Sequence, residues 1–149
     1  MLKEKLSEDL KRSLKDRDQT AVSVLRMTLA SLHNKEIEKR EALTDDQVLS
    51  VLSSEQKKHQ DSIAQFQSGG REDLVVKEEA ELRIIESYLP VPMSEEELRV
   101  LVRGAIAVIG VTGKEDFGKV MKEVMVKALG RASGSAVSKI VAEEINKTF

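Results

Sequence analysis

Apolar residues recur at helical spacing along the chain, with charged and polar residues between them. The first stripe consists of Leu2, Leu6, Leu10 and Leu14. The second consists of Val22, Leu25, Leu29 and Leu32. Because residues three and four apart share one face of a helix, the stripes predict two amphipathic helices, the second capped by Asp18 and running to about Arg40.

Two more helices are predicted before a boundary that contains two prolines. Thr44 and Gln47 have the spacing of a capping box and start a third helix, whose stripe is Val48, Leu52, His59, Ile63 and Phe66. A turn at Ser68-Gly69-Gly70 leads to a fourth helix, marked by Leu74, Leu82, Ile85 and Leu89. Pro90 and Pro92 end it, since proline removes an amide donor and disfavours helical geometry in the residue before it.

The stretch after the prolines predicts three short helices. Ser94 and Glu97 form a second capping box, and the helical pattern that follows stops at Gly110. The same spacing recurs from Phe117 to Ala128 and from Val137 to Ile145.

One segment has an alternative. Ala105 to Val111 is apolar and rich in β-branched residues, which also suits a buried strand, but unbroken helical spacing from Leu98 favours a helix. The predicted fold is all-α, with a helical N-terminal domain over residues 1–92 and a three-helix C-terminal domain over residues 93–149.

Composition restricts the environment of the protein. Apolar residues make up 40% of the chain and aromatic residues 3%, so the core is expected to consist of aliphatic side chains. The sequence has no cysteine, which excludes disulfides and thiolate catalysis. It shows neither a secretory signal nor the about 20 consecutive apolar residues that cross a bilayer. A cytoplasmic protein with no membrane association is expected.

No arrangement of residues predicts catalysis, a metal site or a cofactor. His33 and His59 lack a metal-binding spacing, and helix packing is the favoured role for both. Ser133 lacks a nucleophile elbow and is better placed as an N-cap. The stretch Gly113 to Val120 has the glycines and lysine of a phosphate-binding loop, but Val120 stands where a magnesium-binding hydroxyl is required.

Charge is uneven, although the formal net charge is only -2. Between residues 112 and 142 only Glu115, Asp116 and Glu123 oppose a larger basic set, which consists of Lys114, Lys119, Lys122, Lys127, Arg131 and Lys139. Such side chains suit the phosphate backbone of a nucleic acid. Alternatively, these lysines complement helix dipoles and keep the surface soluble. Without interleaved aromatic residues, any contact with RNA would read shape and backbone.

Short motifs in order along nearly the whole chain resemble the GatB/YqeY family. They are Leu25-Arg26-Met27, Asn34-Lys35-Glu36-Ile37, Asp61-Ser62, Gly70-Arg71-Glu72-Asp73-Leu74, Tyr88-Leu89-Pro90, Ser94-Glu95-Glu96-Glu97-Leu98, Gly118-Lys119-Val120-Met121 and Gly130-Arg131-Ala132-x-Gly134. The resemblance implies a helical N-terminal domain and a C-terminal domain similar to the tail of the GatB subunit of tRNA-dependent amidotransferase. That tail helps hold misacylated tRNA, and the catalytic parts of the enzyme lie elsewhere.

Two functional hypotheses follow. In the first, the chain is a non-catalytic, tRNA-binding accessory protein, in which the basic residues above meet the RNA backbone. In the second, its N-terminal helices form a protein-interaction module that docks an amidotransferase or synthetase subunit. The family association with carbon-nitrogen ligase activity, with glutamine as amido-N-donor, would reach this chain through a shared domain, not through catalytic residues of its own.

Overall fold

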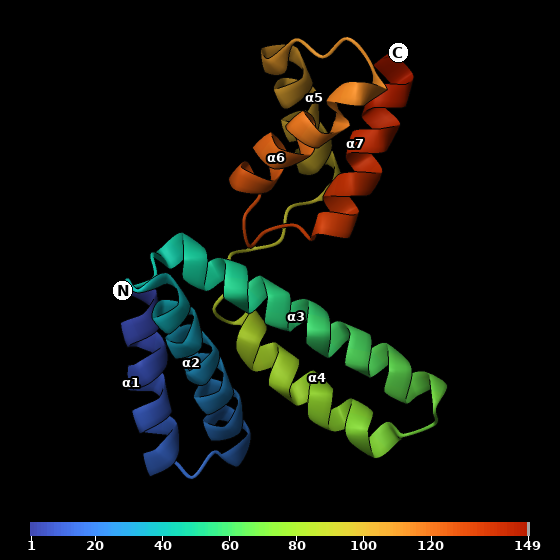
Figure 1. The fold of residues 1–149 in the computed structure, drawn as a ribbon. Helices are drawn as coiled ribbons and strands as arrows, with labels where there is room; N and C mark the ends of the chain where they lie inside the picture. The colour runs from blue at the N-terminus through green and yellow to red at the C-terminus, as the bar shows by residue number, and fades with distance from the viewer. Residues whose placement is uncertain (149) are drawn as a thin grey trace. The chain divides into compact units, whose positions relative to one another are not determined.

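The structure, a computed structural model, describes residues 1–148 and confirms the all-α prediction (Figure 1). The first part of the chain contains α1 (Leu2–Lys15), α2 (Gln19–Lys39), α3 (Asp45–Ser68) and α4 (Glu72–Glu86). The second contains α5 (Glu95–Ile109), the short 3-10 helix η1 (Lys114–Asp116), α6 (Phe117–Lys127) and α7 (Gly134–Thr148). Within residues 1–148, no helix has the length and apolar character that a membrane span requires.

Side-chain caps start the helices where the sequence predicts them. The carboxylate of Asp18 accepts a hydrogen bond from the backbone N–H of Ala21 at 3.1 Å and caps α2. Thr44 and Gln47 make both hydrogen bonds of a capping box at the start of α3. The hydroxyl of Ser133 accepts from the backbone N–H of Ala136 at 3.1 Å, which confirms its role as an N-cap.

The second predicted capping box forms only in part. The Ser94 hydroxyl accepts a hydrogen bond from the backbone N–H of Glu97 at 3.1 Å. The carboxylate of Glu97 instead lies 3.2 Å from the guanidinium of Arg131. Glu97 therefore pairs with Arg131, which is distant in sequence, and not with the backbone of Ser94 as its spacing predicts.

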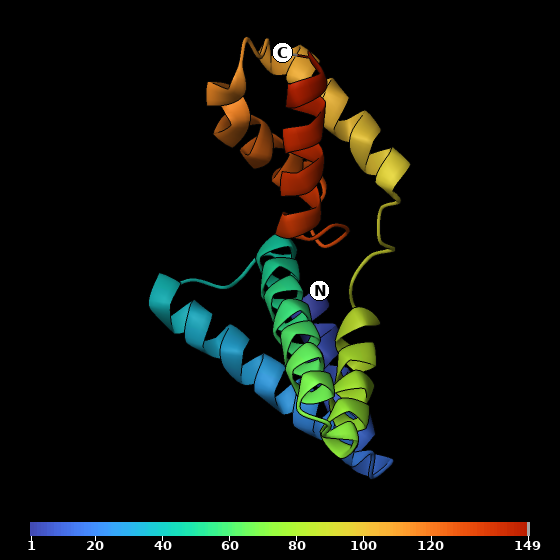
Figure 2. The same cartoon turned by 90° about the vertical axis from the view of Figure 1, so that its right-hand side faces the viewer.

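Residues Met1–Pro90 form one compact unit. Its core consists of aliphatic side chains from all four helices: Leu6, Ala21, Val24, Leu25, Leu32, Val48, Leu52 and Ile85. Helices α3 and α4 lie side by side as a hairpin, which Figures 1 and 2 both show. Gly70 makes the turn between them with a φ of 70°, a left-handed conformation that glycine adopts without strain.

Tyr88 holds the end of this unit in place just after α4. Its hydroxyl donates a hydrogen bond to the carboxylate of Asp9 on α1 at 2.5 Å, and the ammonium group of Lys5 lies 5.6 Å from the ring centre. Burial, together with the Asp9 carboxylate, raises the pKa of the Tyr88 hydroxyl. The phenol therefore stays protonated and keeps donating.

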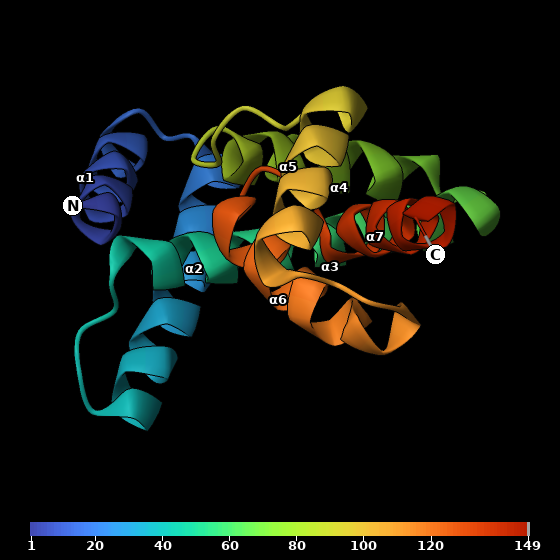
Figure 3. The ribbon, with the colours of Figure 1, turned by 90° about the horizontal axis from the view of Figure 1, so that it is seen from above.

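A second compact unit begins at Val91 and packs α5, α6 and α7 around its own core, and Figure 3 shows these helices in yellow, orange and red. The buried residues are Leu98, Val102, Ala105, Val111, Val120, Val124, Ala128, Val137, Ile140, Val141 and Ile145. The segment with a strand alternative is helical as far as Ile109, and Gly110 then ends α5 with a φ of 74°. Whether each unit folds independently, as a domain does, stays a prediction.

Candidate nucleic-acid interface

Three of the six predicted basic residues lie on the exposed surface of α6. Val120 and Val124 are fully buried in the core, which turns Lys119, Lys122 and Lys127 towards solvent. Lys119 and Lys122 are three residues apart and share one side of the helix, whereas Lys127 lies in its last turn. We call the solvent-exposed surface that these three lysines occupy the α6 lysine face. A flexible ammonium group on such a surface can contact phosphate oxygens without rearrangement of the fold.

Acidic neighbours oppose this face only weakly. Lys119 lies 3.4 Å from Asp116, whose side chain is only 13% exposed, and Lys127 lies 3.2 Å from the more exposed Glu123. Lys122 makes no ion pair with any residue from 1 to 148. The Lys127–Glu123 pair is exposed on both sides and contributes little stability, so a phosphate could replace Glu123 at small cost. The Lys119 side chain is itself 72% exposed, so its ammonium group can also reach a phosphate.

Lys114 lies just before α6, in η1, within the stretch that resembles a phosphate-binding loop. Asp116 accepts a hydrogen bond from the backbone N–H of Thr112 at 3.1 Å, and this bond is the main cause of the lowered pKa of its carboxyl group. The Asp116 carboxyl group therefore favours its ionised form, and its negative charge within the stretch opposes a phosphate. The resemblance to a nucleotide loop does not extend to its hydrogen bonding.

Arg131 has partners within its own unit. Its Nε donates to the carbonyl oxygen of Val91 at 2.8 Å, and a terminal guanidinium nitrogen pairs with Glu97. Its own carbonyl accepts from the backbone N–H of Met93 at 2.8 Å. Arg131 therefore fastens the segment before α5 to the turn between α6 and α7, and this contact would compete with RNA.

Lys139 belongs to a different surface. It lies on α7 one turn before Glu143, whose carboxylate pairs with Arg99 of α5 at 2.5 Å. The charge of Lys139 also helps lower the pKa of Glu95, after the larger effect of Arg99. Lys119, Lys122 and Lys127 are all exposed on α6, whereas Lys139 lies on the side of α7 that faces α5.

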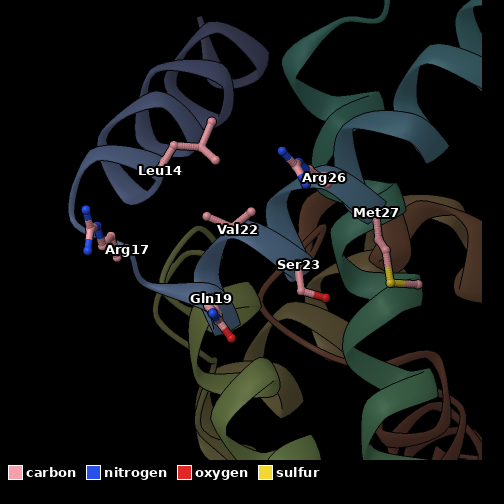
Figure 4. A pocket seen from close by; sticks show the side chains of 7 residues that line it. All are labelled: Leu14, Arg17, Gln19, Val22, Ser23, Arg26 and Met27. Atoms are coloured by element: carbon pink, nitrogen blue, oxygen red, sulfur yellow. The ribbon is translucent and has the colours of Figure 1, made fainter.

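An open pocket lies in the first unit, where α1 is followed by α2 (Figure 4). It has a volume of about 570 Å³ and is lined by Leu14, Arg17, Gln19, Val22, Ser23, Arg26 and Met27. Leu14 is 46% exposed and Met27 69% exposed, so the pocket presents apolar surface beside two guanidinium groups. The sequence predicts that Leu14 belongs to the apolar stripe of the first helix. It does not indicate that this end of the stripe is left uncovered by other helices.

A group of side chains that the sequence did not bring together lies on the α3–α4 hairpin. The imidazole of His59 on α3 contacts carboxylates of Glu78 and Glu81 on α4. His59 stands about ten residues before the glycine turn, and the two glutamates stand about as far after it. An antiparallel hairpin brings such positions opposite each other. Their similar distance from the turn was the feature of the sequence from which this contact could have been predicted.

Comparison with known proteins gives a consistent result. A family model described as Yqey-like protein matches residues 3–145. A curated relative from Pyrenophora tritici-repentis, named Altered inheritance of mitochondria protein 41, mitochondrial, is 32% identical over 145 residues, which cover 95% of this chain and 79% of the relative. A relative of the same name from Kluyveromyces lactis is 31% identical over 152 residues, with coverage of 97% and 82%.

These names contradict the expectation of a cytoplasmic protein, which is wrong: the relatives are named as mitochondrial. The expectation rested on the lack of cysteine and of a secretory signal. Both features argue against an oxidising, secretory environment, but neither separates the cytosol from the interior of an organelle. Composition therefore could not decide between these locations.

Proposed function

The chain belongs to the YqeY family, and from this membership together with the charge on α6 we propose that it is a non-catalytic accessory protein that binds tRNA. The observation that carries the proposal is the α6 lysine face. Three ammonium groups along one helix can meet successive phosphates, and the contact needs no aromatic side chain. The resemblance to the tail of the amidotransferase supports tRNA as the ligand.

The lysines and Arg131 contribute differently in this proposal. Lys119, Lys122 and Lys127 are exposed and bind the RNA backbone. Lys114 adds charge just before the same helix, whereas Arg131 keeps the unit folded through Val91 and Glu97. Lys139 contributes positive charge to the electrostatic field of the second unit without contacting the RNA.

Binding of transcribed tRNA at several salt concentrations tests the proposal. Each phosphate contact contributes about 0.7–0.9 to the slope of log affinity against log salt. We expect the triple variant Lys119→Ala, Lys122→Ala, Lys127→Ala to bind more weakly and to lose about two units of this slope. Filter binding or fluorescence anisotropy measures both quantities.

A charge-matched control distinguishes a local RNA-binding site on α6 from general electrostatic attraction between the protein and RNA. Lys57, Lys58 and Lys77 are exposed on α3 and α4, and changing all three to Ala removes the same charge from the first unit. This control should keep the salt slope. Binding without salt dependence, or an equal loss in both triple variants, would remove the α6 lysine face as the site.

The pocket of the first unit favours a second candidate function, a protein-interaction module. Exposed apolar side chains beside Arg17 and Arg26 suit an amphipathic, acidic segment of a partner such as an amidotransferase or synthetase subunit. Size-exclusion chromatography with purified subunits, after nuclease treatment, tests for a complex. Met27→Ser should weaken it, whereas Ile37→Ser, at another exposed apolar position of α2, should not.

A further inference from the structure

Three side chains of metal-binding type converge where α3 and α4 face each other. Nδ1 of His59 lies 2.6 Å from Oε2 of Glu78 and 3.8 Å from Oε2 of Glu81. One ligand atom from each residue lies within 4.8 Å of the others. Because Glu78 and Glu81 are three residues apart on one helix, both carboxylates point at the same partner helix.

The charges of this group do not balance within the protein. Among residues 1–148, the only ion pairs of Glu78 and Glu81 are with His59. A protonated imidazole offsets one carboxylate at most, and a neutral imidazole offsets neither. The side chains are only 20%, 20% and 13% exposed, so water screens the remaining negative charge incompletely.

A divalent cation would match both the charge and the spacing. A neutral imidazole and two carboxylates around a 2+ ion sum to zero. Zinc binds imidazole nitrogen and carboxylate oxygen at about 2.0–2.2 Å, so tetrahedral ligand atoms lie about 3.4 Å apart. The two distances from His59 lie on either side of this value, and small side-chain rotations bring both to it.

We propose that His59, Glu78 and Glu81 form a binding site for a divalent transition-metal ion, with Zn²⁺ as the ion that suits one imidazole and two carboxylates. Three protein ligands leave a coordination position for water. The site does not depend on RNA binding, since it lies on a different unit from the α6 lysine face.

The position in the hairpin indicates what a bound ion would do. The core of the first unit includes Leu52 of α3 and Ile85 of α4, which lie on the side of the site away from the turn. The stretch from His59 to the turn at Gly70 lies beyond these residues, and Figure 1 shows the hairpin extending to that turn. An ion joining the helices at this point would stabilise the outer part of the hairpin.

Titration of the metal-free 149-residue protein with ZnCl2 tests the site. We expect one ion bound per chain, a higher melting temperature with Zn²⁺, and no comparable effect of the same concentration of Mg²⁺, which gives up its water reluctantly. His59→Gln should weaken Zn²⁺ binding at least tenfold, since loss of even an indirect support of a metal ligand weakens binding about 10- to 100-fold. Isothermal titration calorimetry measures affinity and stoichiometry.

The second histidine provides a matched control. His33 is exposed on α2, so His33→Gln should leave Zn²⁺ binding unchanged. Glu81→Gln should weaken binding as well, and it leaves the closer contact of His59 with Glu78 intact if His59→Gln disturbs folding. No binding, or binding that survives both His59→Gln and Glu81→Gln, would show that the group is only an ion pair between two helices.

Discussion

Glu144 shows how a single charged residue joins two helices of the second unit. Its side chain is 5% exposed, yet its carboxylate accepts hydrogen bonds from Arg103 at 3.1 Å and from Arg99 at 3.0 Å. Hydrogen bonding from Arg103, and then from Arg99, lowers the pKa of this carboxyl group. The charge of Glu144 therefore stabilises the packing of α7 on α5.

Glu144→Gln should destabilise the protein, because the amide keeps the shape of the side chain but weakens its bonds to both arginines. We expect a loss of about 1.5–3 kcal/mol, the range for hydrogen bonds to charged groups. Glu143 is more exposed, and its only ion pair among residues 1–148 is with Arg99, so Glu143→Gln should lose less than about 1 kcal/mol. Urea unfolding followed by circular dichroism compares the two variants.

The same carboxylate should make stability depend on acid. The pKa of Glu144 in the folded protein lies below its ordinary value of 4.5, so the unfolded chain binds the proton more tightly. Its stabilising effect is complete above pH 4.5 and is lost as the pH falls from there through the folded pKa. The free energy of unfolding measured from pH 6 to pH 3 should fall less steeply for Glu144→Gln than for the parent chain.

At the scale of the helix, two glycines have opposite roles, one within α5 and one just after its end. Gly110 ends the helix with a φ of 74°, whereas Gly104 lies within it, and a Cβ added there would meet nothing within 4 Å. A side chain at Gly110 would be strained in the left-handed region. Gly104 increases the conformational entropy of the unfolded chain, although its helical conformation in the folded protein does not require a glycine.

The two alanine substitutions should therefore change stability in opposite directions. Gly110→Ala should destabilise by about 1 kcal/mol, because L-residues avoid positive φ. Gly104→Ala should stabilise by about 0.5–1 kcal/mol, the difference in helix propensity. Thermal unfolding of both variants gives the sign directly, and a change of the same sign in both would contradict this account of α5.

Helices and their caps could be predicted because their signals are local. Asp18, Thr44 and Ser133 each accept a hydrogen bond from an amide three residues away, and Gly110 ends α5 as expected. The partners of Glu144 and Arg131 could not be predicted, since both depend on which helices pack together and in which rotation. The sequence predicted which lysines α6 exposes, but not that Arg131 would already have partners.

At the scale of the whole chain, Arg131 decides where a fragment of the second unit should begin. A start at residue 94 removes the Val91 carbonyl and the Met93 amide that Arg131 contacts, whereas a start at residue 91 keeps both. The predicted boundary between residues 92 and 93 divides this segment. The boundary of the compact units, after Pro90, leaves it whole.

Fragments 1–90 and 91–149 should each unfold cooperatively if the units are independent domains. Fragment 94–149 should be less stable than 91–149 by about 1–2 kcal/mol, the contribution of two lost hydrogen bonds. Both C-terminal fragments should be acetylated, so that no new positive charge lies at the start of α5. Urea denaturation measures the difference, and a fragment 91–149 that remains unfolded would rule out an independent domain.

The contacts of Tyr88 and Arg131 also affect how readily proteases cleave the chain between its two units. Tyr88 is bonded to Asp9 on one side of the boundary, and Val91 to Arg131 on the other, which leaves only Leu89 and Pro90 between the two anchors. Proteases preferentially cleave exposed loops whose backbone is free to bend into the active-site cleft of the enzyme. The junction should therefore resist digestion until one anchor opens, so that its cleavage rate reports local opening rather than a permanently accessible linker.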